Sequence, residues 1–137
     1  MLTEIIQLSF DKIMQTRAYT VIVLSAQGKK FAIYTEPSIG KILQDHLTGT
    51  KKGRPMTHDL IMNVLKGANV RIRQVVINDV QETTYFARLF LEYDADDLQH
   101  IIEIDSRPSD CITLALINNV PVYCTQEVLE KSLTIDE

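Results

Sequence analysis

The chain has 137 residues, of which 45% are hydrophobic, 23% charged and 7% aromatic. This length fits one domain with a sizeable core, and this composition excludes a disordered or collagen-like chain. The net charge of -4, from 14 basic and 18 acidic residues, contrasts with the basic excess of proteins dedicated to nucleic acids. The apolar runs are far shorter than the ~20 residues of a membrane-spanning helix, so we expect no membrane partner.

The first part of the chain predicts three strands and a helix. Residues 2–14 alternate between apolar and polar side chains, which is the two-residue period of a half-buried strand. Residues 18–35 are rich in β-branched and apolar side chains and predict a hairpin with its turn at Gly28. After Glu36-Pro37, apolar residues recur at helical spacing and predict a helix that ends near Gly49.

The middle of the chain predicts a second helix and a second hairpin. A basic loop at residues 51–55 precedes Thr57, which is a suitable N-cap for a helix that ends near Gly67. Residues 70–80 and 83–93 both alternate between apolar and polar side chains, so we expect them to pair across a turn.

The last part of the chain predicts a mixture of short elements. In order, they are a polar loop at 94–97, a strand at 100–105, a third helix from about 106 to 118, a short strand at 121–124 and a helical turn or two at 127–132. This order contains no regular alternation of strand and helix. We therefore expect an α+β fold, with a largely antiparallel mixed sheet or partial barrel flanked by three to four helices.

The domain organisation and the cysteines allow three further expectations. Residues 1–133 form a single domain, and residues 134–137 form a flexible C-terminal tail. The segment that follows Met1 contains Glu4 and does not resemble a secretory signal, so we expect a cytoplasmic location. Cys111 and Cys124 have no metal-binding or redox spacing and are expected to be buried free thiols.

Charge is unevenly distributed along the chain. Residues 51–73 contain six basic residues and one acidic residue, whereas residues 92–110 contain seven acidic residues and one Arg. Two interpretations remain open. The two stretches could be solvated faces that attract each other within one fold, or the basic stretch could form a cationic groove.

The chain lacks the common dinucleotide, phosphate-loop, zinc-protease and nucleophile-elbow motifs. Polar residues do gather at the start of the predicted second helix. His58 lies beside Asp59, and a histidine with a pKa near ~6.5 next to a carboxylate could act as a general base or hold a metal-bound water. Alternatively, the two residues only occupy a helix N-terminus, where negative charge is favoured.

A second polar group opens the predicted third helix. Free N–H groups at a helix start and the guanidinium of Arg107 could bind phosphate, or Arg107 and Asp110 could simply pair with each other. A third group lies on the preceding strand, where Glu103 and Asp105 could share a divalent cation. The alternative for these two carboxylates is a solvated sheet face.

Four segments in a fixed order resemble the bifunctional nuclease domain family. They are Gly53-Arg-Pro-Met-Thr-His-Asp-Leu60, Thr84-Tyr-Phe-Ala-Arg-Leu89, Asp105-Ser-Arg-Pro-Ser-Asp110 and Pro121-Val-Tyr123. The resemblance spans nearly the whole chain. It implies a mixed α/β domain, a tendency to dimerise, and the DNase and RNase activity reported for some members. The motif residues that it carries over are Arg54, His58, Asp59, Arg107 and Asp110.

One position departs from the pattern of the family that this chain resembles. Members commonly have an acidic residue after an Ile-Gly-Pro-like turn, and ungapped matching places Ile39 at that position. If the family carboxylate takes part in catalysis, this chain lacks it there. Glu36 lies close enough in the sequence to take its place through a shifted loop.

We therefore predict a nuclease-like protein that hydrolyses phosphodiester bonds of DNA or RNA. The predicted catalytic residues are His58, Asp59, Arg107 and Asp110. The predicted nucleic-acid-binding residues are Lys51, Lys52 and Arg54. A divalent cation is the only cofactor considered, and its ligands are not assigned.

The expected partners are a second copy of the chain and a DNA or RNA substrate. Hairpins with strongly apolar strands leave sheet edges that must be covered, and a two-fold contact is the commonest solution, so we predict a homodimer. The alternative function is a non-catalytic dimeric regulatory module. Such a module would bind a protein or an anionic ligand through the same helix starts.

Overall fold

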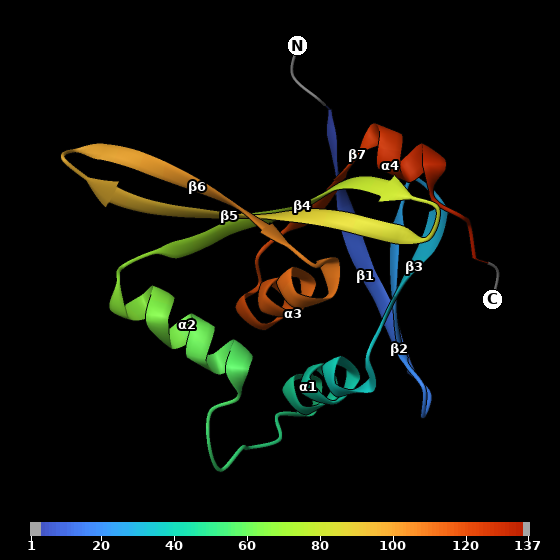
Figure 1. Ribbon diagram of the computed structural model, residues 1–137, viewed down its shortest axis with the longest axis horizontal. Helices are drawn as coiled ribbons and strands as arrows, with labels where there is room; N and C mark the ends of the chain where they lie inside the picture. The colour runs from blue at the N-terminus through green and yellow to red at the C-terminus, as the bar shows by residue number, and fades with distance from the viewer. Residues whose placement is uncertain (1–3, 136–137) are drawn as a thin grey trace.

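The computed structural model describes residues 4–135, which form one α+β domain with an open, seven-stranded mixed sheet and four helices (Figure 1). In chain order the elements are β1 (Ile5–Gln15), β2 (Thr20–Ala26), β3 (Lys29–Thr35), α1 (Pro37–Thr48), α2 (Thr57–Gly67), β4 (Arg71–Gln81), β5 (Thr84–Ala95), β6 (Leu98–Ser106), α3 (Pro108–Asn118), β7 (Val122–Thr125) and α4 (Gln126–Lys131). The predicted fold class is confirmed.

The sheet has the strand order β3-β2-β1-β7-β4-β5-β6. Five of its six strand pairs are antiparallel, and only β4 and β7 pair in parallel. The parallel pair arises because the chain crosses over through α3 before β7 inserts between β1 and β4. The largely antiparallel sheet expected from the sequence is therefore present.

Strand β1 joins the two halves of the sheet. Its first residues, Ile5 to Leu8, pair with β7, and its later residues pair with β2. The register with β2 shifts between Phe10 and Lys12, and such a bulge bends and twists a strand. In Figure 1, β2 and β3 accordingly run steeply across the long strands β4, β5 and β6.

Helix α3 is the central helix of the domain. Figure 1 shows α1, α2 and α3 together on one side of the β4–β6 strands and α4 on the other. Residues 111–115 of α3 are all buried, because this helix is apolar on nearly every side and packs between α1, α2 and the sheet. Its burial fixes the position of its first turn relative to the other helices.

Proline opens both α1 and α3, as predicted. The residues before these prolines, Glu36 and Arg107, are the N-cap residues and have the extended backbone that a following proline favours. The start of α2 differs from the prediction, because Thr57 is the first helical residue and Met56 is the N-cap. The backbone N–H of Met56 donates to Asp59 Oδ2 at 2.7 Å, so the carboxylate of the third helical residue supplies an acceptor for the N-cap N–H.

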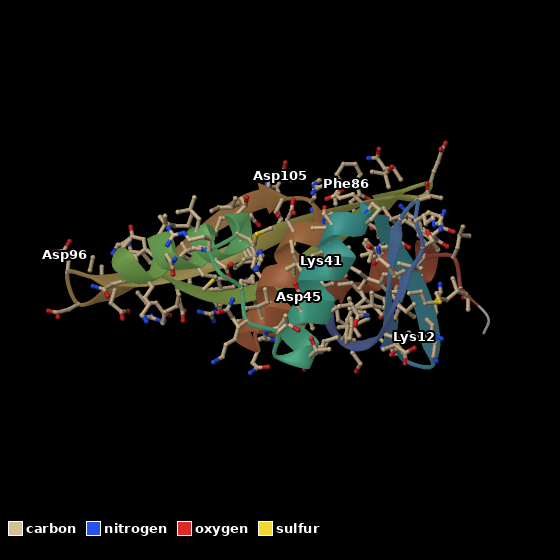
Figure 2. All side chains as sticks on the ribbon, turned by 90° about the horizontal axis from the view of Figure 1, so that it is seen from below. Lys12, Lys41, Asp45, Phe86, Asp96 and Asp105 are labelled. Atoms are coloured by element: carbon tan, nitrogen blue, oxygen red, sulfur yellow. The ribbon has the colours of Figure 1, made fainter. Side chains whose placement is uncertain are left out.

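The polar loop expected at residues 94–97 is shorter than predicted. Strand β5 continues to Ala95 and β6 begins at Leu98, so Asp96 and Asp97 alone form the turn. Both have positive φ, 54° and 61°, which Asp tolerates better than most residues. Figure 2 shows Asp96 at the tip of this hairpin, at one end of the molecule.

The two ends of the chain lie partly outside the described residues. Residues 2 and 3 of the predicted first strand, and residues 136 and 137 of the predicted tail, fall there. The backbone N–H of Ile135 donates to the carbonyl of Lys30 on the edge strand β3 at 2.9 Å. The Ile135 side chain packs against a small cluster that contains Val21 and Val23.

The remaining fold-level expectations concern the cysteines and the membrane. Cys111 and Cys124 are buried and free, as predicted. Burial raises the pKa of each thiol to about 11, so both remain protonated at neutral pH. Among residues 4–135, no helix has the length and apolar character needed to cross a membrane.

Candidate functional site

A pocket of about 630 Å³ lies where the starts of α1, α2 and α3 meet β5 and β6. Its polar lining includes Glu36 at the start of α1, His58 at the start of α2, Asp110 in the first turn of α3 and Asp105 near the end of β6. The starts of three helices therefore contribute to one hollow, although they are far apart in the sequence.

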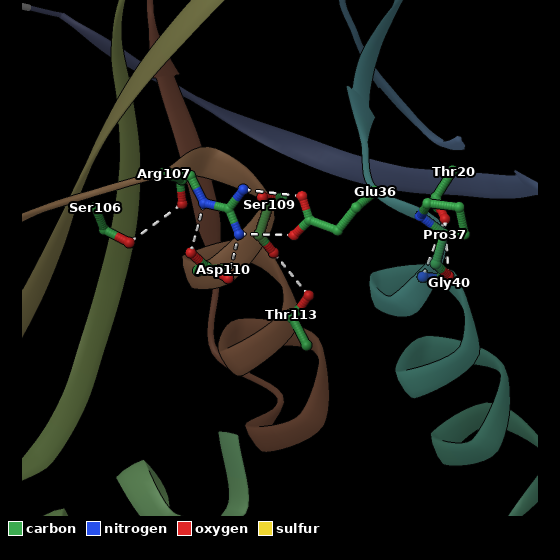
Figure 3. A network of polar contacts seen from close by, with 9 residues as sticks. All are labelled: Thr20, Glu36, Pro37, Gly40, Ser106, Arg107, Ser109, Asp110 and Thr113. Carbon is green, nitrogen blue, oxygen red and sulfur yellow. Dashed lines mark hydrogen bonds and ion pairs between the residues drawn. The ribbon is translucent and has the colours of Figure 1, made fainter. Parts of the chain in front are cut away.

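Arg107 connects two of these helix starts through a network of ion pairs. Its guanidinium donates to both carboxylate oxygens of Glu36, at 2.9 and 2.7 Å, and to both carboxylate oxygens of Asp110, at 2.9 and 3.1 Å. Figure 3 shows Glu36 reaching from the start of α1 toward Arg107 at the start of α3. Paired bonds of this kind fix both the distance and the relative orientation of the groups.

The network shifts the acid–base properties of its members. The hydrogen bonds from Arg107 lower the pKa of Glu36 from its ordinary value of 4.5 to about 2, and the two carboxylates raise the pKa of Arg107. Arg107 has five N–H groups, and its four bonds to the carboxylates leave one N–H on Nη1 for a ligand. The three side chains are between 41% and 57% exposed, so water screens their charges.

A buried threonine holds the start of α1 in place behind this network. Thr20 is fully buried on β2, and its hydroxyl accepts a hydrogen bond from the backbone N–H of Gly40 at 3.1 Å. The same hydroxyl donates to Gln15 Oε1 at 2.8 Å, and Gln15 Nε2 donates to the carbonyl of Pro37 at 3.2 Å. These bonds anchor the first turn of α1 to the sheet and so position the adjacent Glu36; Figure 3 shows Thr20 beside Pro37 and Gly40.

A second polar cluster lies at the start of α2. Lys52 Nζ donates to Asp59 Oδ2 at 2.6 Å and lies 3.1 Å from Nε2 of His58. The hydrogen bond from Lys52 is the main cause of the lowered pKa of Asp59. His58 is only 8% exposed, and burial lowers its pKa below 6.5 more strongly than the charge of Asp59 raises it.

The contact with Lys52 decides which ring nitrogen of His58 carries the proton. Nε2 also lies 3.3 Å from Asp59 Oδ1 but forms no hydrogen bond with it. Because a lysine ammonium can only donate, the bond with Lys52 makes Nε2 the acceptor and assigns the proton of the neutral ring to Nδ1. Nδ1 is buried and has no hydrogen-bond partner among residues 4–135. An unsatisfied buried donor costs about 1–3 kcal/mol, and such groups often occur where a ligand supplies the missing partner.

The structure brings the predicted catalytic residues to the pocket in different ways. His58 and Asp110 line it directly. Arg107 lines a neighbouring hollow of about 290 Å³ and forms the wall between the two hollows together with Glu36, which lines both. Asp59 does not line the pocket. It binds Lys52 and lies 3.3 Å from Nε2 of His58, which does line the pocket.

The predicted nucleic-acid-binding residues lie in the loop between α1 and α2. Lys51 and Arg54 are exposed and form no ion pair with any residue between 4 and 135. Lys52 instead belongs to the His58 cluster. Within residues 4–135, two of the three predicted cations therefore have no ion-pair partner, and none of the three lines the pocket.

Other basic residues of the segment 51–73 pair with the acidic segment 92–110. Arg71 contacts Glu92 and Asp94, both at 3.3 Å, and Arg73 contacts Glu92 at 3.1 Å across the β4–β5 hairpin. These pairs support the interpretation that the two charged stretches attract each other within the fold. Within residues 4–135, the basic residues of this segment without an ion pair are Lys51 and Arg54 in the loop before α2 and Lys66 in the last turn of α2.

Glu36 is the site residue that the predicted catalytic set omitted. Ile39, which the family resemblance aligned with an acidic position, is buried and lies in the apolar lining of the pocket. A signal for Glu36 was present in the sequence. Glu36-Pro37-Ser38 and Arg107-Pro108-Ser109 are matching helix starts with opposite charges at the same position, which is the pattern expected of two N-caps that face each other.

The arrangement of acidic groups bears on the divalent cation considered above. Among residues 4–135, no three His, Cys, Asp or Glu side chains are grouped so that they could hold a metal ion. Glu36 and Asp110 both bind Arg107. A cation at these carboxylates would therefore compete with the guanidinium.

Comparison with known proteins places the chain in a family. Two uncharacterized proteins of Mycobacterium tuberculosis, MT1877 of strain CDC 1551 and Rv1829 of strain H37Rv, are each 33% identical to it over 84 residues. The aligned part is 61% of this chain and 47% of each relative, so the chain spans about half the length of these relatives. The bifunctional nuclease domain matches residues 21–136, which confirms the resemblance seen in the sequence motifs. The chain belongs to the bifunctional nuclease domain family.

Proposed function

We propose that the chain hydrolyses phosphodiester bonds of DNA or RNA at the pocket between the starts of α2 and α3. The observation that carries the proposal is that His58 and Asp110, from two distant helix starts, line the same pocket. Family membership supports the reaction class. The positive end of the α2 helix dipole favours an anionic ligand on that side of the pocket.

The proposed roles follow from the bonding capacity of each side chain. The Nδ1–H of His58 has no hydrogen-bond partner in the described part of the chain and would donate to a phosphoryl oxygen, where negative charge grows in the transition state. The Asp110 carboxylate uses two of its roughly four lone-pair sites on Arg107. A remaining site would orient the attacking water and accept its proton as the new bond to phosphorus forms and the bond to the leaving oxygen breaks.

A cleavage assay tests the proposal. Single-stranded and duplex DNA and RNA are incubated with the full chain, with and without Mg²⁺ or Mn²⁺. We expect cleavage that falls about 100-fold or more in Asp110→Asn, because the amide cannot accept the proton. Asp94→Asn is the matched control, since Asp94 binds Arg71 and lies outside the pocket.

Contaminating nucleases are the main source of false activity in this assay. Activity that is equal in the wild type and in Asp110→Asn would identify a contaminant. An absence of cleavage under every condition would contradict the proposal. It would favour the alternative of a non-catalytic module that binds a protein or an anionic ligand.

We also propose that the protein is a homodimer that pairs through β6. The two edges of the sheet differ, because the backbone of Ile135 covers part of β3, whereas β6 has no neighbour on its outer side among residues 4–135. Antiparallel pairing of two β6 strands centred on Ile102 would place Glu103 opposite Ile101. No two carboxylates would then oppose each other.

Light scattering at micromolar concentration tests this assembly. We expect a dimer for the wild type and a monomer for Ile102→Lys, because the substitution would place two like charges opposite each other at the two-fold axis. Tyr34→Lys, an exposed position on the opposite edge strand, should remain dimeric. A monomeric wild type, or a dimeric Ile102→Lys variant, would contradict the proposed interface.

A further inference from the structure

The pocket has an apolar half that phosphodiester chemistry does not use. Hydrolysis needs polar and charged groups around the phosphorus, and the helix starts supply these. The apolar lining consists mainly of Ile39, Ile61, Leu89, Leu91, Ile104 and Leu114. This half of the pocket therefore suits a different part of a ligand.

The apolar half is open because α2 packs loosely over the sheet. His58 is the one buried residue within α2. Ile61 on α2 and Ile104 on β6, which both line the pocket, remain 39% and 40% exposed. A bound apolar group would remove these side chains from water, which is favourable by roughly 25 cal/mol for each Å² of apolar surface.

The size of the pocket limits what can enter it. A volume of about 630 Å³ lies within the range of ~300–1,000 Å³ typical of small-molecule sites, and it suits one base with its sugar. Bases inside a duplex are stacked and paired. A base can reach such a pocket only from a single strand or after it has left the stack.

We propose that the pocket binds one unstacked nucleobase of a single-stranded nucleic acid, with the base on the apolar half and its phosphate at the mouth. The inference rests on the proposed function, because it takes the nuclease substrate as the ligand. Thr57, at the start of α2, is exposed and lines the same pocket, so its hydroxyl can bond to the edge of a base, while His58 remains available to the phosphate.

Charge favours this orientation over the reverse one. Glu36 and Asp110 share one guanidinium, and Asp105 has no ion-pair partner among residues 4–135, so the α3 side of the pocket carries net negative charge. A phosphate deep in the pocket would be repelled, whereas a neutral base would not. The phosphate is better placed toward the loop that precedes α2, where Lys51 and Arg54 are exposed and have no ion-pair partner within residues 4–135.

Binding by the wild-type protein gives the first test. Isothermal titration calorimetry compares adenosine, guanosine, cytidine and uridine 5′-monophosphates with ribose 5-phosphate, which has the same phosphate and sugar but no base. We expect at least one nucleotide to bind about tenfold or more tightly than ribose 5-phosphate, because only the base reaches the apolar half. Equal affinities, or no binding of any probe, would overturn the inference.

Two substitutions on α2 give the second test. Ile61→Trp would fill part of the pocket and should weaken nucleotide binding about tenfold. Val64→Trp is the matched control, since Val64 lies on the same helix, is exposed and does not line the pocket, and its affinity should equal that of the wild type. Equal effects of the two substitutions would overturn the inference. If Ile61→Trp does not fold, the wild-type comparison with ribose 5-phosphate decides.

Cleavage rates separate this inference from the proposed function. Cleavage of single strands about tenfold or more faster than duplexes, together with base-dependent binding, supports both. Cleavage of both substrates at equal rates, with binding that does not depend on a base, keeps the nuclease function and overturns the base pocket. Base-dependent binding without cleavage of any substrate supports the base pocket and overturns the nuclease function.

Discussion

The starts of α3 and α2 place polar side chains on two sides of one pocket, but these side chains differ in how fully they are hydrogen-bonded. At the start of α3, Arg107 makes four hydrogen bonds to Glu36 and Asp110, and all three side chains are substantially exposed. At the start of α2, His58 is almost completely buried, and its Nδ1 has no hydrogen-bond partner among the residues that the structure describes.

This difference separates positioning from ligand contact. Exposed charges that are already paired gain little from a further ligand, but they hold the first turns of α1 and α3 in a fixed relation. A buried donor without a partner gains a full hydrogen bond when a ligand supplies an acceptor. For the function proposed above, we therefore expect the stronger interaction with substrate at His58 and a mainly positioning role for Glu36.

The largest expected effect compares the two clusters directly. His58→Gln removes the unpaired Nδ1–H and should lower kcat for a single-stranded oligonucleotide about 100-fold. Glu36→Gln leaves an amide oxygen that can still accept from Arg107, so we expect a decrease of about tenfold or less. Steady-state kinetics measures both variants.

A histidine outside the pocket is the control for that comparison. The ring of His100 stacks on Tyr93 and does not line the pocket, so His100→Gln should retain the wild-type kcat. A larger loss in Glu36→Gln than in His58→Gln would reverse the comparison. It would place the main substrate contact at the start of α3.

The second effect concerns the support behind the α3 network. Thr20→Val preserves the shape of the side chain but leaves the backbone N–H of Gly40 without its acceptor, so we expect a loss of about 2 kcal/mol in the free energy of unfolding. Urea denaturation measures this loss. The exposed Thr84 is the control, because Thr84→Val should change stability by less than about 0.5 kcal/mol. Equal stability of Thr20→Val and the wild type would show that α1 does not depend on this anchor.

Local sequence patterns were sufficient to predict most of the fold. Alternation predicted the strands of both long hairpins, and the proline at Pro37 and Pro108 predicted two helix starts, because these signals depend on neighbouring residues. The two-residue turn at Asp96 and Asp97 was not predicted, because Asp is common both in longer loops and in turns with positive φ. The position of β7 between β1 and β4 is a long-range feature that no local pattern contains.

The site was less predictable for the same reason. The bond between Arg107 and Asp110 joins residues three apart and could be expected from the sequence alone. The bond between Arg107 and Glu36 depends on how α3 packs against α1. The burial of His58 likewise depends on how α2 lies over the sheet, so neither its lowered pKa nor its unpaired Nδ1 could be predicted from a histidine beside an aspartate.

The third effect concerns the pH dependence of the α3 network. The pKa of Glu36 falls from 4.5 to about 2 on folding, so the stabilisation by its charge is complete above pH 4.5 and is lost as the pH falls toward 2. Because the pair is exposed, we expect Glu36→Gln to cost about 1 kcal/mol or less at pH 7.

The free energy of unfolding as a function of pH measures this effect. The difference between the wild type and Glu36→Gln should be constant above pH 4.5 and should shrink between pH 4.5 and 2. Glu103→Gln is the control, because the side chain of Glu103 is exposed and forms no hydrogen bond or ion pair with the residues between 4 and 135. A difference that grows in acid would contradict the assignment of the ion pair to Glu36.

The smallest effect distinguishes the basic residues beside the α2 cluster from one another. Lys51→Ala and Arg54→Ala should each weaken binding of a single-stranded oligonucleotide only a few-fold and reduce the salt dependence of binding by about one phosphate contact. Lys52→Ala should also lower kcat at saturating substrate, because Lys52 holds His58 and Asp59. Fluorescence anisotropy between about 50 and 200 mM salt measures the affinities, with Lys66→Ala, at the far end of α2, as the control. If all four variants had the same salt dependence as the wild type, the loop would not contact phosphate, and the difference between the two helix starts would rest on His58 alone.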